Sequence, residues 1–330
     1  MIDPIALIEL TNLKASGKLI DLARHPGLTM KPEWMAELVE NKDWYVRYNL
    51  AKNPALATYP DIIKALASDK DRYVRQSLAS NPAIANFPEI VERLSTDNSS
   101  NVRHYLAQNP AIANCPEAIQ TLSKEGSGYV RQALAKNPAL ATYPDIIKAL
   151  AADKDRWVRW CLAHNPVIEV APPAVAGLAT DRALLVRRSL ADNPALAECP
   201  ETVTKLASDR NREVHIALAQ NPAIANYPDI IQALASDKDR YVRQSLASNP
   251  ALANFPEIIQ ALSADKDWHV RQSLAENPAI ASCPEVVGQL STDEDWTVRS
   301  TLASNPAIPS RTARTNSWQT SQQSRPVPTL

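Results

Sequence analysis

The chain has few of the residues that would point to an enzyme or to a small secreted domain. Its 330 residues include six glycines, two phenylalanines and four cysteines, namely Cys115, Cys161, Cys199 and Cys283. The cysteines lie far apart in sequence, so we expect free thiols in a reducing cytoplasm and not a disulfide framework. No Gly-rich phosphate loop, Ser-His-Asp set or Cys/His metal spacing occurs, so we expect no catalytic residues, no metal site and no cofactor.

The chain also lacks an excess of charge and a long apolar run. It has 35 basic and 36 acidic residues, which gives little support to nucleic acid as the main partner. No stretch of about 18 apolar residues is present, and the N-terminus has no basic leader, so we expect neither a membrane span nor a secretory signal. These observations predict a cytoplasmic, monomeric protein.

The dipeptide Asn-Pro recurs ten times at intervals of 28 residues, without an insertion or deletion. The asparagines are Asn53, Asn81, Asn109, Asn137, Asn165, Asn193, Asn221, Asn249, Asn277 and Asn305. A fixed period of this length is typical of a solenoid. The residue before the second proline of each unit, such as Tyr59 before Pro60, also follows a pattern that repeats every three units, and 53–80, 137–164 and 221–248 are near copies. This pattern indicates duplication of a three-repeat block. The duplication also explains why three of the cysteines are equally spaced.

Residues 53–80 illustrate one repeat. Pro60 suits the first turn of a helix, and an apolar stripe follows it, so we expect helix A at roughly 60–68. The Asp69-Lys70-Asp71 turn supplies a cap for helix B, which ends at the residue before Pro82. The short stretch 82–87 is predicted to form a 3₁₀ turn.

The predicted fold is therefore all-α, a right-handed α-solenoid of ten 28-residue repeats, each with two short α-helices and a 3₁₀ turn. The Val74, Leu78 and Ala79 columns do not vary among the ten units, so we expect them to form the core. We assign residues 1–30 to an N-terminal helical cap, 31–308 to the repeat array and 309–330 to a disordered C-terminal tail rich in Ser, Thr, Gln and Arg.

The recurring block D-x-x-x-x-V-R-x-x-L-A-x-N-P, seen for example from Asp237 to Pro250, resembles the leucine-rich repeat variant family within the HEAT-like group of α-solenoids. The resemblance covers about residues 30–308, although that family's repeat is usually shorter. Its founding member carries an iron–sulfur cluster, but this chain lacks the clustered cysteines for one.

The resemblance implies that an arginine column and an acidic column form a ladder between neighbouring repeats. The arginines, which follow the invariant Val, are Arg47, Arg75, Arg103, Arg131, Arg159, Arg187, Arg243, Arg271 and Arg299. Nine acidic residues, from Asp69 to Asp293, lie six positions before the arginines from Arg75 onward and before His215. His215 replaces arginine once, which predicts a weaker joint opposite Asp209. A phosphate-binding stripe is the alternative, and a calcium site in the acidic turns is disfavoured because the turns supply too few oxygens.

A binding surface is predicted where helix B varies, at the positions of Tyr73, Gln76, Ser77 and Ser80. The middle repeats depart most from this default, and an exposed tryptophan is unusual on a soluble surface. We expect the centre of a concave partner site at Trp157, Trp160, His164, Arg188, His104 and Tyr105. The alternative is that these residues drifted after duplication and that the indoles pack on neighbouring repeats. A second aromatic group, Trp44, Tyr45 and Tyr48, lies in the first repeat.

Among functions, a non-catalytic interaction scaffold that binds a protein or peptide on the concave face is preferred. Nucleic-acid binding is the first alternative, because several arginines lie near the centre of the chain. Other HEAT-like proteins act on DNA bases or attach chromophores, but here His104 and His164 would lie about 18–20 Å apart, too far to act together. A structural spacer is the last alternative.

Overall fold

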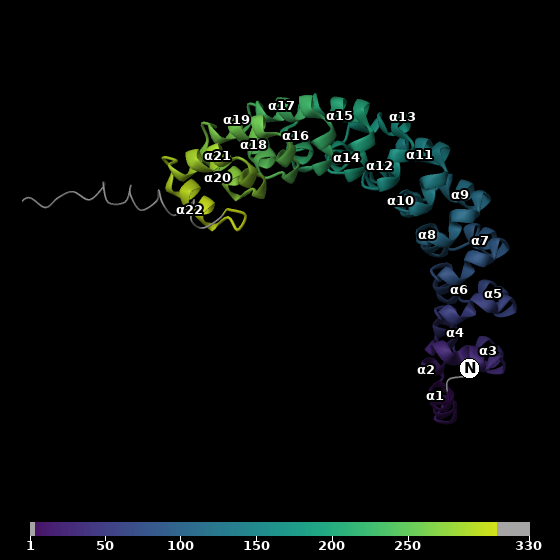
Figure 1. Ribbon diagram of the computed structural model, residues 1–330. Coiled ribbons are helices and arrows are strands. Elements are labelled where there is room, and N and C mark those ends of the chain that lie inside the picture. The colour runs from purple at the N-terminus through teal and green to yellow at the C-terminus, as the bar shows by residue number, and fades with distance from the viewer. Residues whose placement is uncertain (1–3, 309–330) are drawn as a thin grey trace, which may run out of the picture. The chain divides into compact units, whose positions relative to one another are not determined.

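The computed structural model describes residues 4–308, and over this range the chain is helical, without a β-strand. Each repeat runs from a 3₁₀ helix to helix A and then helix B (Figure 1). The predicted all-α repeat fold is thus confirmed, whereas the predicted tail, 309–330, lies outside the described residues. None of the helices in the described range combines the length and apolarity needed to cross a membrane.

Helix A begins at a proline in every repeat, where the missing amide proton loses no helical partner. An acidic residue usually follows, at the positive end of the helix dipole. These helices are α3 (Pro32–Val39), α5 (Pro60–Ala67), α7 (Pro88–Ser95), α9 (Pro116–Ser123), α11 (Pro144–Ala151), α13 (Pro172–Val175), α15 (Pro200–Ala207), α17 (Pro228–Ala235), α19 (Pro256–Ser263) and α21 (Pro284–Ser291).

In most repeats helix B is capped by the side chain of the last residue of the preceding turn. Asp71, for example, accepts a hydrogen bond from the Tyr73 amide at 2.8 Å, which satisfies one free donor of the first turn. These helices are α2 (Leu19–Arg24), α4 (Trp44–Ala51), α6 (Arg72–Ala79), α8 (Ser100–Gln108), α10 (Gly128–Ala135), α12 (Arg156–Ala163), α14 (Leu184–Ala191), α16 (Arg212–Gln220), α18 (Arg240–Ala247), α20 (Trp268–Glu276) and α22 (Trp296–Ser304). Among them, α2, α8, α10 and α14 lack such a side-chain cap.

The short 3₁₀ helices confirm the prediction for the segments after the first nine Asn-Pro dipeptides, and one more follows His25-Pro26 in the same way. They are η1 (Pro26–Met30), η2 (Pro54–Thr58), η3 (Pro82–Asn86), η4 (Pro110–Asn114), η5 (Pro138–Thr142), η6 (Pro166–Val170), η8 (Pro194–Glu198), η9 (Pro222–Asn226), η10 (Pro250–Asn254) and η11 (Pro278–Ser282), with η7 (Leu178–Thr180) in a different position. The predicted cap contains α1 (Pro4–Ala15), α2 and η1. His25 caps η1 as the asparagines cap the others, so the repeat pattern begins before residue 31.

The repeating asparagines link each repeat to the one before it, a role that the sequence analysis did not assign to them. The side-chain oxygen of Asn109 accepts from the Ala111 amide and caps η4. Its amide group donates to the Ala79 carbonyl, at the end of the preceding helix B, at 2.9 Å and to the Asn81 carbonyl at 3.0 Å. The side chain is 4% exposed, so it satisfies buried backbone groups that water cannot reach.

The predicted arginine ladder is also present. The guanidinium of Arg131 donates to both carboxylate oxygens of Asp153 in the next repeat, at 2.6 and 3.0 Å, and both side chains are less than 10% exposed. Equivalent pairs are Arg47–Asp69, Arg75–Asp97, Arg103–Glu125, Arg187–Asp209, Arg243–Asp265 and Arg271–Asp293. Burial would raise the pKa of Asp153, but hydrogen bonds from Arg131 and the Asp155 amide outweigh it and hold that pKa below its ordinary value.

The sequence predicted that His215 lies opposite Asp209, and this prediction was wrong. His215 lies 2.9 Å from Asp237 of the next repeat, through Nδ1, whereas Asp209 accepts from Arg187. The reason is that each arginine pairs with the carboxylate of the following repeat, whereas it meets the acidic residue of its own repeat only at the backbone carbonyl, as Arg187 does at Asp181. The Nε2 atom of His215 is buried without a hydrogen-bond partner.

The invariant columns form the core of each repeat, as predicted. Val74, Leu78 and Ala79 are fully buried, and so is Ile84 of the 3₁₀ helix. Ser77, however, is also buried, and its hydroxyl donates to the Tyr48 carbonyl of the preceding repeat. Most members of the Ser77 column, such as Cys161, therefore face the neighbouring helix, whereas Tyr105 of the same column stays on the variable exposed face.

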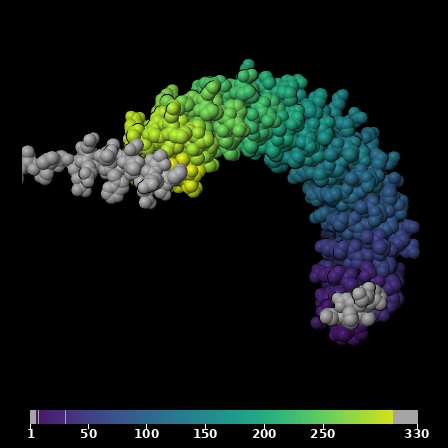
Figure 2. Space-filling model, viewed as in Figure 1, coloured from purple at the N-terminus to yellow at the C-terminus, as the bar shows by residue number. Residues whose placement is uncertain are grey.

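The chain divides into two compact units, which meet in sequence between Ala174 and Val175. In each unit the A helices form one layer and the B helices the other (Figure 1), and residues close in sequence follow one another in space, as the colour order in Figure 2 shows. The division falls within α13, the shortest A helix, with four residues. Gly177, a poor helix former, lies where the other A helices continue, which explains the shortening.

Candidate interaction surface

Two tryptophans project from α12 in the B layer of the first unit. The Trp157 side chain is 42% exposed, and its ring meets that of Trp160 edge to face, with the centroids 5.8 Å apart. Trp160 is half-buried, and its ring lies 4.8 Å from that of His164, which is exposed at the end of the helix. The structure therefore brings these three predicted residues together, and Trp157 is not packed between repeats.

Cations cover the faces of both indoles. The guanidinium of Arg156 lies 5.2 Å from the centre of the Trp157 ring, and the ammonium of Lys136, from α10, lies 5.7 Å from that of Trp160. Each contact is a cation–π interaction, worth roughly 0.5–1 kcal/mol at an exposed site. The cluster is therefore electropositive as well as aromatic.

The carboxylate of Asp155 is in close contact with residues at the start of α12 and with α10. This aspartate caps α12 by accepting from the Trp157 amide at 2.9 Å, and Gln132 donates to its second oxygen at 3.2 Å. A methyl group added at Gly128 would lie 2.4 Å from that same carboxylate. Glycine at the start of α10 thus leaves room for the cap that positions the tryptophan helix.

His104 and Tyr105, on α8, have different environments. Tyr105 is 36% exposed, whereas His104 is only 7% exposed and stacks on Tyr129 with the ring centroids 3.6 Å apart. Nδ1 of His104 also donates to the Tyr129 carbonyl at 3.1 Å. Burial lowers the pKa of His104, and the positive charge of Lys136 lowers it further. The hydrogen bond to the Tyr129 carbonyl acts in the opposite direction, but the pKa stays below its ordinary value. A partner can reach Tyr105 directly, but not His104 while Tyr129 covers it.

Arg188, the remaining predicted residue, is exposed on α14 in the second unit. The aromatic cluster described above is made by the first unit alone. Two of its members, Tyr129 and Lys136, were not among the predicted site residues, although Tyr129 is 51% exposed. The sequence did carry a signal for Lys136, because it precedes His164 by one repeat in the variable Ser80 column.

A second aromatic cluster lies on α4 and α6 of the same layer. Trp44 contacts the rings of Tyr45 and Tyr73 at 5.5 Å, and Tyr45 stacks on Tyr48 at 5.8 Å. The ammonium of Lys52 lies 4.5 Å from the Tyr48 ring centre. The pattern of exposed rings with adjacent cations is therefore repeated at two places along this layer.

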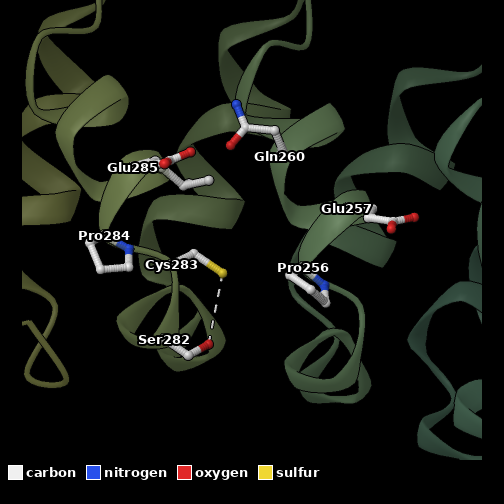
Figure 3. A pocket seen from close by; sticks show the side chains of 8 residues that line it. Pro256, Glu257, Gln260, Ser282, Cys283, Pro284 and Glu285 are labelled. Carbon is white, nitrogen blue, oxygen red and sulfur yellow. Dashed lines mark hydrogen bonds between the residues drawn. The ribbon is translucent and has the colours of Figure 1, made fainter.

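A groove of about 640 Å³ lies in the second unit between the first turns of α19 and α21, both helices of the A layer (Figure 3). Glu257 and Gln260 line it from one helix, and Cys283 and Glu285 from the start of the other. Cys283 is half-buried, whereas Cys115, Cys161 and Cys199 are buried. The groove is open and brings no acid–base pair together. In residues 4–308, no three His, Cys, Asp or Glu side chains are grouped so as to hold a metal ion.

No protein-family model matches the chain, and no curated protein is significantly similar to it. Among solved structures, a leucine-rich repeat variant with a novel repetitive structural motif is similar at 21% identity, with a TM-score of 0.45, over 72% of this chain and 88% of that one. The X-ray structure of the Escherichia coli protein YibA, a structural-genomics target, is similar at 16% identity, with a TM-score of 0.37, over 80% and 96% of the two chains.

Proposed function

We propose that the protein is a non-catalytic interaction scaffold whose B layer binds a protein or peptide partner, centred on α10 and α12. The observation that carries the proposal is the exposed Trp157 beside Trp160, with both rings held by cations. Tryptophan, tyrosine and arginine dominate the binding energy of protein interfaces. The protein would act as a monomer in the cytoplasm, where thiols such as its four cysteines stay reduced.

The packing of the helices supports the choice of layer. Within each unit, successive B helices approach one another over a longer stretch than successive A helices do. The more closely packed row of a solenoid is its inner, concave side, where a partner meets several repeats at once. Site residues on the B helices of the first unit would then converge on the same ligand.

Nucleic-acid binding remains the second candidate, because Lys136 and Arg156 are exposed. The ladder arginines do not add to it, since Arg75 and Arg131 are buried in bidentate pairs with aspartates of the next repeat. A phosphate stripe along that column would require these pairs to break.

The test is a pull-down from lysate of the source cell with the native chain and a Trp157→Ala/Trp160→Ala/His164→Ala variant. A Tyr241→Ala/Trp296→Ala variant is the matched control, because it removes two exposed rings from the second unit. We expect a protein that is retained by the native chain and by the control but lost by the triple variant. Equal recovery by all three would overturn the proposed site.

A further inference from the structure

The two layers of the first unit differ in charge. Its A helices, α3 to α11, contain seven carboxylates and three cations in sequence, whereas its B helices, α4 to α12, contain no carboxylate. Four exposed cations lie on the B layer, namely Lys52, Arg72, Lys136 and Arg156. In the described residues, no ion pair joins any of these four to a carboxylate of the protein.

In the second unit, the two arginines at the position of Arg72 and Arg156 each form an ion pair with an aspartate. There Arg240 lies 3.3 Å from Asp267 and Arg212 lies 3.7 Å from Asp239, each pair spanning 27 residues. In the sequence, Ser99 and Ala183 stand 27 residues after Arg72 and Arg156. The exposed arginines of the first unit thus lack the acidic residue that their counterparts have, which leaves their charge available to a ligand.

The four cations are held in place by aromatic rings. Lys52 lies over Tyr48, Arg72 over Tyr73, Lys136 over Trp160 and Arg156 over Trp157, at 4.5–5.7 Å from the ring centres. A cation that is already ordered loses less conformational freedom when it meets an anion. Because its own cation covers one face of each ring, only the other face can stack on a base of a single-stranded nucleic acid. Fixed cations beside half-covered rings therefore favour carboxylates over nucleotides.

The spacing of the repeats sets the form of the ligand. Neighbouring helices pack about 8–10 Å apart, and one turn of an extended polyproline II chain, three residues, spans about 9 Å. A segment in this extended conformation that crosses the B helices therefore presents every third side chain, on the same side of the segment, to successive repeats.

We infer that the ligand of the first unit is an acidic, extended polypeptide segment with carboxylates at about every third residue. The inference rests on the proposed function and specifies its partner. It does not extend to the second unit, where α16 and α20 contain Glu213 and Glu276 and the arginines are paired.

The test uses the full chain and a fluorescein-labelled peptide of six Glu-Gly-Ser units, followed by anisotropy at low salt. The site variant is Lys136→Gln/Arg156→Gln, and the control is Lys64→Gln/Lys148→Gln, which removes the same charge from exposed positions of the A layer. We expect the native chain and the control to bind alike and the site variant to bind about tenfold more weakly. A Gln-Gly-Ser peptide should not bind, and a peptide with its glutamates in one block should bind less tightly.

Equal binding by the site variant and the control would overturn the inference, as would tighter binding of a labelled oligothymidylate that depends on the same two cations. The outcome for the proposed function is separate. A protein captured from lysate that is lost with Trp157→Ala/Trp160→Ala, but retained by Lys136→Gln/Arg156→Gln, would support the scaffold and refute an acidic ligand.

Discussion

At the scale of the residue, the asparagine before each 3₁₀ proline makes three hydrogen bonds from a buried position. Its role could not be read from the sequence, because a residue before proline is already expected to end a helix. The same is true of His104, which occupies the place of Gln76 and Gln132 but stacks under a tyrosine of the next repeat. Sequence position predicts which helix face a residue lies on, whereas the packing of one ring on another depends on three-dimensional contacts between repeats.

Replacing Asn109 by alanine should lower the free energy of unfolding by about 3 kcal/mol, because one amide and two carbonyls lose partners in a buried site. Chemical denaturation followed by circular dichroism measures the change. Asn114, exposed in the same repeat, is the control, and Asn114→Ala should cost less than about 0.5 kcal/mol. Similar losses for the two variants would refute a bridging role for Asn109.

The buried His104 should make stability depend on pH. Burial lowers its pKa in the folded state below the ordinary 6.5, so the unfolded chain takes up a proton first as the pH falls. Its contribution to stability is therefore complete above about pH 6.5 and is lost as the pH falls through the folded pKa. A His104→Gln variant should lose less stability than the native chain between pH 7 and 5. Parallel pH profiles from denaturation curves would contradict this expectation.

At the scale of the element, the sequence predicted helices, turns and the 3₁₀ segment closely, because proline, asparagine and aspartate act at helix ends through local chemistry. α5, predicted at roughly 60–68, spans Pro60–Ala67. The shortened α13 was not predicted, although Gly177 carried the signal. The partner of His215 was also missed, since which of two aspartates a side chain reaches depends on how neighbouring repeats stack.

A single substitution at His215 should stabilise the contact between its repeat and the next one. His215→Arg would restore a bidentate pair with Asp237 and a permanent charge, as in the Arg187–Asp209 pair of the preceding joint. We expect stability to rise by about 1 kcal/mol, measured as a higher Tm. Arg243→Gln, which breaks the pair with Asp265 in the next joint, should instead destabilise by about 3 kcal/mol, since it leaves a buried carboxylate unpaired. A lower Tm for His215→Arg would show that the site is shaped for the smaller ring.

At the scale of the whole molecule, the 28-residue period was sufficient to predict the fold class, because each repeat contacts its neighbours through the same columns. The candidate site was less accessible to sequence analysis. The tryptophans were identified from their departure from the column default, whereas Tyr129 has the default residue of its column, and the departure at Lys136 was not recognised as part of the site.

Because Arg75 would meet Glu125 as Arg103 does now, and the asparagine ladder repeats without change, removal of the repeat 81–108 in register should preserve both ladders. After deletion of residues 81–108, Asn109 would meet Ala51 and Asn53, the same groups that Asn81 meets now. We expect a folded, helical chain with a lower Tm, whereas deletion of half a repeat should leave both ladders out of register. Loss of helical circular dichroism in the in-register deletion would show that the repeats are not equivalent.

The unequal burial of the four thiols has a practical consequence. Since burial raises the pKa of Cys115 and Cys161, and Cys199 is equally enclosed, a maleimide dye applied to the folded protein should attach at Cys283 alone, beside the groove of Figure 3. The native chain is thus a single-site labelled reporter without engineering. If another cysteine becomes modified in mass spectra, the repeat that contains it has opened. The three buried thiols would thus report separately on three parts of the array.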